Sequence, residues 1–209
     1  MRNYDKFGSI VSEVNVSIRR EDTGEVLYAA HNVIVNVSKW LFARLMANVF
    51  PNDPNPPYTQ GHETLYGVWG LALGAGSPQW APETQPDPTP VQTALIAEFL
   101  RKPLSKVNFV DSNQNPLSTL STTVDFQTTI NATTDNITQG IREMGLIGGG
   151  SFGTNSPSTN TNMLTAPYFN PTAIPPGPAN SVVLVNYLTL PPLILPPGVN
   201  VIISWVLSF

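Results

Sequence analysis

Apolar and polar residues alternate along several segments of the chain, as they do in strands that bury one face. Within 9–19, the apolar positions that fall on one side are Ile10, Val14, Val16 and Ile18. Asp22-Thr-Gly24 then supplies turn residues, so 26–28 is predicted to return as the second strand of a hairpin. The segment 199–209 alternates strictly to its last residue, and we expect this strand to be locked into a sheet.

Further strands and two helices are predicted along the rest of the chain. The other extended segments are 31–36, 65–73, 104–110, 124–130, 140–147 and 182–190. Gly67 and Gly70 interrupt one of them, which indicates a bulge or close backbone packing. Apolar residues near helical spacing predict a helix over 38–49, which the prolines after Asn52 end, and a short helix over 93–99.

Long inserts rich in proline and glycine separate these elements, at about 51–64, 74–90 and 148–180. Loops of this length are uncommon in compact domains unless they have a function. We interpret them as arms or rims that become ordered against neighbouring subunits, and solvent-exposed flexible loops are the alternative. Because helices do not alternate with strands, we predict a mainly β fold. The expected architecture is an antiparallel β-sandwich with one or two short helices, forming a single domain over residues 1–209.

The composition restricts the classes of partner. The chain has 209 residues, no cysteine, and 10 basic against 14 acidic residues. Charged residues make up 11%, compared with about 25% in ordinary domains. A surface with few charges suits a protein that partner subunits largely cover. A neutral exterior rich in Ser, Thr and Asn explains the same composition equally well. The sequence contains no cluster of Lys and Arg, so nucleic-acid binding is not predicted. No apolar run is long enough to predict a membrane span.

One motif resembles an enzyme signature, but its context argues against catalysis. Gly149-Gly-Ser151-Phe-Gly153 matches a hydrolase nucleophile elbow, which requires an acid and a histidine later in the chain. Both histidines, His31 and His62, precede it. The same glycines lack the helix that a dinucleotide site needs. We therefore expect no enzyme activity and no cofactor.

The remaining ionisable residues do not suggest a site either. The two histidines are too few and too far apart in sequence to predict a zinc site, so no metal is expected. The carboxylates are scattered, and no pair stands out as the two catalytic acids of a glycosidase. Glu143 lies in a predicted strand, and we expect it to be buried and paired with Arg101 or Lys102.

Aromatic residues in or beside the predicted loops are the candidate interface residues. They are Tyr4, Tyr58, Trp69, Trp80, Tyr168 and Phe169. Such side chains are good anchors for protein–protein contacts, and they can also stack on sugars. The alternative is that they cover the edges of the sandwich.

Several segments, taken in order, resemble the small structural proteins of tailed-bacteriophage virions that are grouped with tail-collar, tail-fibre or baseplate components. They include Asp22-Thr-Gly-Glu-Val26, Trp40-Leu-Phe-Ala-Arg-Leu-Met46, Leu71-Ala-Leu-Gly-Ala-Gly76, Pro90-Val-Gln-Thr-Ala-Leu95, Gly140-Ile-Arg-Glu-Met-Gly-Leu146 and Ile203-Ser-Trp-Val-Leu-Ser-Phe209. The resemblance extends from about residue 20 to the end, and the inserts at 51–64 and 148–180 depart from it. The resemblance implies a role in assembly, and it assigns no catalytic residues to this chain.

The expected function is that of a non-enzymatic subunit of the tail, neck or baseplate, in a virion assembled in the host cytoplasm. Its partners would be other virion proteins and copies of itself in a symmetric assembly. A capsid cement or decoration protein is the first alternative. The second is a fibre module that binds a receptor or a host-surface glycan, with Trp69 and Trp80 among its stacking residues.

Overall fold

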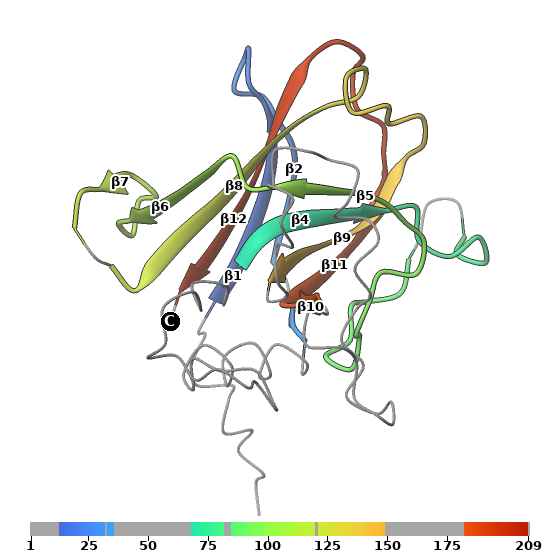
Figure 1. Ribbon diagram of the computed structural model, residues 1–209, viewed down its shortest axis with the longest axis horizontal. Coiled ribbons are helices and arrows are strands. Elements are labelled where there is room, and N and C mark those ends of the chain that lie inside the picture. Colours follow the sequence, from blue (N-terminus) through green and yellow to red (C-terminus); the bar gives the residue numbers. More distant parts are fainter. Residues whose placement is uncertain are drawn as a thin grey trace, which may run out of the picture. The chain divides into compact units, whose positions relative to one another are not determined.

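The computed structural model describes residues 13–31, 33–35, 68–81, 85–119, 121–148 and 182–208. These residues form β-strands and connecting segments, and they contain no helix. Accordingly, no helix in the described part of the chain could cross a membrane. The strands form two antiparallel sheets, and the chain divides into two compact units (Figure 1). The helix predicted over 38–49 lies outside the described residues.

The first unit comprises Met1–Asn32, Leu104–Gly140 and Ile194–Phe209, and it contains one six-stranded sheet. The strand order in this sheet is β2-β1-β12-β8-β6-β7. The strands are β1 (Glu13–Arg20), β2 (Val26–His31), β6 (Lys106–Val110), β7 (Pro116–Leu117), β8 (Thr123–Asn131) and β12 (Asn200–Ser208). The predicted hairpin is confirmed, because β1 and β2 pair antiparallel and Gly24 adopts the positive φ of 71° that their turn requires.

Strand β12 lies inside this sheet and is paired on both sides along its length. Its neighbours are β1 and β8, so Trp205 lies opposite Val16 on one side and Phe126 on the other. The alternating residues Val201, Ile203, Trp205 and Leu207 are at most 1% exposed. The period-two pattern therefore predicted this strand and its firm place in a sheet correctly, because every second side chain faces the core.

The second unit comprises Val33–Pro103 and Ile141–Leu193. Its sheet has the order β3-β11-β9-β4-β5, and β10 pairs with β9 beside this path. The strands are β3 (Val33–Ile34), β4 (Val68–Gly74), β5 (Glu98–Pro103), β9 (Ile141–Gly148), β10 (Val183–Leu184) and β11 (Asn186–Leu193). The described residues thus confirm the mainly β class and supply the two antiparallel sheets of which a β-sandwich consists.

Two local predictions have different outcomes in this unit. The bulge or close backbone packing expected in the strand at 65–73 is confirmed, because the pairing of β4 with β9 shifts register between Val68 and Gly70 and a Cβ at Gly70 would lie 3.0 Å from the carbonyl oxygen of Lys102. The short helix expected over 93–99 is wrong. Residues 93–97 form neither helix nor strand, and β5 begins at Glu98 and pairs with β4. The backbone amides of Ile96 and Ala97 donate to a buried carboxylate, which holds the segment away from a helical conformation.

The three predicted inserts differ in how far they are described. The insert at 51–64 lies outside the described residues, and so does 149–180 of the third. The insert at 74–90 is described except for 82–84, and as predicted it contains no regular element in its described part after Gly74.

We predict that Trp205→Ala lowers the free energy of unfolding by about 3–5 kcal/mol, because it leaves a cavity between β1 and β8. Denaturant unfolding followed by circular dichroism measures this loss. The matched control is Val26→Ala, at a position that is 59% exposed, where we expect a change within about 0.5 kcal/mol. Equal effects at the two positions would contradict the central place of β12.

Candidate functional site: the anchored proline-rich loop

A long loop connects β4 to β5 in the second unit, over residues 75–97. Its described part contains Pro78, Pro86, Pro88 and Pro90, which lack the amide that a strand ladder requires. The loop therefore runs without regular structure, and its position depends on contacts with the sheet beneath it.

The side chain of Glu143, on β9, is the main anchor of this loop. Glu143 is 0% exposed. Its Oε1 accepts hydrogen bonds from the amides of Gly76 at 3.2 Å and Ala97 at 2.7 Å. Its Oε2 accepts from the amide of Ile96 at 3.0 Å and from the hydroxyl of Tyr187 at 2.7 Å. One carboxylate thus ties the first turn of the loop to its last residues.

These donors explain how a carboxylate can be buried here. Burial of a carboxylate is costly unless hydrogen bonds replace its hydration, and here three backbone amides and one hydroxyl donate to it. Burial raises the pKa of Tyr187 well above its usual value, and the charge of Glu143 and the hydrogen bond to it act in the same direction. The Tyr187 hydroxyl therefore remains protonated and remains a donor.

Gly74 supplies the space that the carboxylate occupies. A Cβ at this position would lie 2.7 Å from Cγ of Glu143 and 2.9 Å from the carbonyl oxygen of Ala97. Both distances are shorter than real Cβ contacts, so a larger residue would displace Glu143 or the end of the loop. The glycine that closes β4 is thus part of the anchor.

Two further contacts hold the loop to the same sheet. The guanidinium of Arg142 donates to the carbonyl oxygen of Ala81 and lies 5.4 Å from the centroid of the Trp80 ring. The Trp80 ring packs on Gly76 so closely that a Cβ there would overlap the ring, and the positive φ of 69° also favours glycine at this position. On β11, the hydroxyl of Thr189 donates to the carbonyl oxygen of Pro86 at 2.7 Å. The loop is therefore fixed near its beginning, in its middle and at its end.

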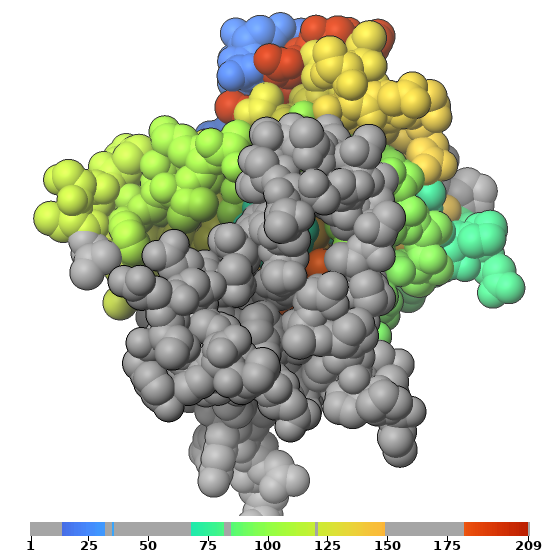
Figure 2. Space-filling view, viewed as in Figure 1, coloured from blue at the N-terminus to red at the C-terminus, as the bar shows by residue number. Residues whose placement is uncertain are grey.

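The anchored loop directs apolar side chains outward. Val91 is 71% exposed and Ile96 is 51% exposed, although the amide of Ile96 is bonded to Glu143. The atoms of this segment, in green, are visible at the surface (Figure 2). Val91 and Ile96 thus give the loop exposed apolar area that a partner can cover.

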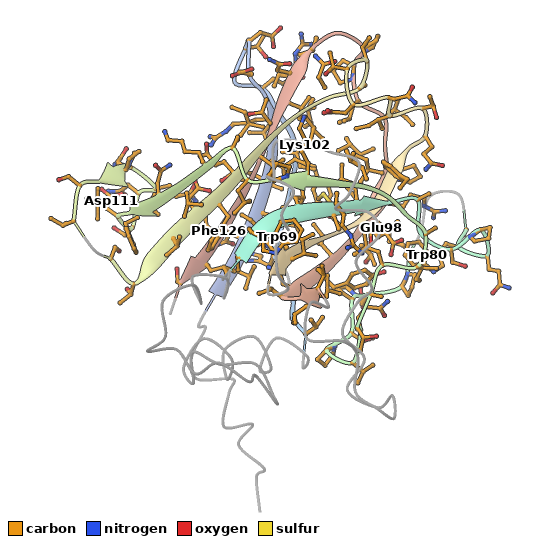
Figure 3. The ribbon with its side chains drawn as sticks, in the orientation of Figure 1. Trp69, Trp80, Glu98, Lys102, Asp111 and Phe126 are labelled. Atoms are coloured by element: carbon orange, nitrogen blue, oxygen red, sulfur yellow. The ribbon has the colours of Figure 1, made fainter. Side chains whose placement is uncertain are left out.

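Of the six candidate interface residues, the structure describes two. Trp69 lies at the start of β4 and Trp80 lies in the loop beyond its end (Figure 3), and both are partly exposed. Gly74 lies five residues further along the strand than Trp69, a distance of roughly 16 Å. The two indoles therefore do not form one stacking platform. Tyr4, Tyr58, Tyr168 and Phe169 lie outside the described residues.

The burial of Glu143 was predicted, but the nature of its anchor was not. We expected Arg101 or Lys102 as the partner, whereas the carboxylate accepts from backbone amides and Tyr187. The guanidinium of Arg101 forms an ion pair with Glu98 on its own strand. Backbone amides that act as donors cannot be recognised from the sequence. The single carboxylate within an apolar strand was therefore the only sign of this anchor in the sequence.

The described part of the chain shows no group of three His, Cys, Asp or Glu that could hold a metal ion. Ser151 and His62 lie outside it. No protein-family model, no curated protein and no solved structure matches the chain.

We predict that Glu143→Gln releases the loop. A glutamine amide would turn an NH₂ group toward backbone donors, so we expect the free energy of unfolding to fall by about 1–3 kcal/mol. Hydrogen exchange read by NMR should show lost protection at the amides of Gly76, Ile96 and Ala97. Glu25→Gln, at an exposed position, is the control and should leave these amides unchanged. Wild-type protection in Glu143→Gln would rule out the carboxylate as the anchor.

Proposed function

We propose that this protein is a non-enzymatic structural subunit of a tailed-bacteriophage virion, in the tail, neck or baseplate, and that it acts through protein–protein contacts. The observation that carries the proposal is the anchored loop, which holds Val91 and Ile96 in exposed positions. The resemblance of the ordered segments to small phage structural proteins supports the class of assembly.

The anchoring of the loop favours association. Binding costs free energy when flexible segments become ordered at an interface. Proline restricts the loop before any partner is present, and Glu143 and Thr189 fix its backbone from below. A partner would therefore meet a surface that is already formed, which reduces the entropy lost on contact.

The charge distribution supports the same role. Between Gln85 and Ala97 the only charged residue in the sequence is Asp87. Interface cores are depleted in charge, whereas free surfaces usually are not. In a symmetric ring each copy repeats the same contact, so about 800 Å² per partner is enough for a stable interface. Copies of the chain and other virion proteins are the proposed partners.

The location within the particle can be tested by copy number. Quantitative gel densitometry of purified particles should give a small number of copies, as one ring requires. Hundreds of copies would indicate a decoration protein on the head, which is the first alternative. Absence of the chain from purified particles would overturn the proposal.

We predict that the double variant Val91→Asp/Ile96→Asp is incorporated into particles at least about tenfold less than the wild type, because it places charge in the contact. Both side chains point outward, so the free energy of unfolding should change by no more than about 0.5 kcal/mol per site. Val26→Asp, at an exposed position in the first unit, is the control and should be incorporated normally. Wild-type incorporation of the double variant would exclude this loop as the contact surface.

A further inference from the structure

The first unit contains a pocket of ≈ 390 Å³ over β1 and β2. Its lining includes Asn15, Ser17, Ala29, His31, Gln114 and Val206. Ser17 and Ala29 lie directly opposite each other in the β1–β2 pair, and their short side chains leave the space open. The next pair, Asn15 and His31, carries longer side chains and bounds the pocket on that side.

Gln114 reaches the pocket from an ordered turn between β6 and β7. The carboxylate of Asp111 accepts hydrogen bonds from the amides of Asn113 and Asn115, each at 2.8 Å. The amide of Gln114 donates to the carbonyl oxygen of Asp111 at 2.9 Å. The bonds from Asn115 lower the pKa of Asp111, so the turn keeps its charged acceptor at neutral pH. Gln114 is therefore presented from a fixed backbone.

The same face of the sheet continues in polar residues that are already bonded to one another. Ser204, which lies opposite Ser17, donates to Oδ1 of Asp125 at 2.6 Å. Gln127 donates to Oδ2 of Asp125 at 2.5 Å. These groups are satisfied within the protein, so they stabilise the sheet. The side chains at the β1–β2 end are the ones that line a space.

The chemistry of the lining indicates the class of ligand. Among the described lining residues, Asn15 and Gln114 offer amides and Ser17 offers a hydroxyl, while Ala29 and Val206 are apolar. Amides and hydroxyls can both donate and accept, as the hydroxyls of a sugar do. Small apolar side chains can contact the C–H groups of a sugar ring. His31 also lines the pocket, and its imidazole can donate to and accept from hydroxyls. No Asp, Glu, Lys or Arg is among the described lining residues.

We propose that this pocket binds a neutral saccharide of one or two units. Its volume lies at the lower end of the range of about 300–1,000 Å³ found for small-molecule sites. The site lies within the first unit and uses none of the residues of the anchored loop. The proposal is thus independent of the assembly role, and it assigns sugar binding to residues other than Trp69 and Trp80.

Saturation-transfer NMR on the full chain, with methyl glycosides of glucose, galactose, mannose and N-acetylglucosamine as probes, tests the proposal. We expect at least one probe to bind with a millimolar dissociation constant, which is typical of a few hydrogen bonds in a shallow site. Asn15→Ala and Gln114→Ala should each weaken binding about threefold to tenfold. Ala29→Phe should abolish it, because the ring would fill the pocket.

Gln139→Ala removes an exposed amide from the same unit, outside the described lining, and should leave affinity unchanged. Circular dichroism identifies any variant that fails to fold. If Ala29→Phe fails to fold, Asn15→Ala and Gln114→Ala still test the proposal. Failure of all four probes at about 10 mM, well above the expected dissociation constant, would overturn the proposal. Binding that persists unchanged in the three pocket variants would overturn it as well. Neither result affects incorporation into particles, which tests the assembly role separately.

Discussion

The burial of the Glu143 carboxylate beneath backbone amides is the interaction on which the candidate contact surface depends. The carboxylate is stable there because amides from both ends of the loop and the Tyr187 hydroxyl replace its hydration. In return, the loop acquires a single conformation that its own sequence, broken by prolines, could not provide. Ordered structure at the surface thus follows from a polar contact in the interior.

The sheet of the first unit is ordered by strand pairing and by the packing of alternating apolar residues. There, β12 is paired on both sides, and its alternating apolar residues place Trp205 and its neighbours in the core. Its polar residues form a separate network through Ser204 and Asp125. Both units have apolar cores, and each also buries a hydrogen-bonded carboxylate, Asp125 in the first and Glu143 in the second.

The two proposed surfaces differ in their chemistry. The anchored loop is apolar and nearly free of charge, which suits contact with another protein. The pocket on β1 and β2 is lined by polar and small apolar side chains and by His31, which suits a hydroxyl-rich ligand. One protein can use both surfaces, because they share no residues.

The sequence determined the strands, because a period of two in side-chain burial is a local property that a β-rich chain repeats along each strand. It also predicted the turn at Gly24, the bulge at Gly70 and the burial of Glu143. The segment 93–99 was mistaken for a helix, because its amides bond to a carboxylate on a strand distant in sequence. The partners of Glu143, the separation of Trp69 from Trp80 and the pocket beside Ser17 were decided only by tertiary structure. Each depends on which strands pair and in what register, and pairing between distant segments leaves no local pattern in the chain.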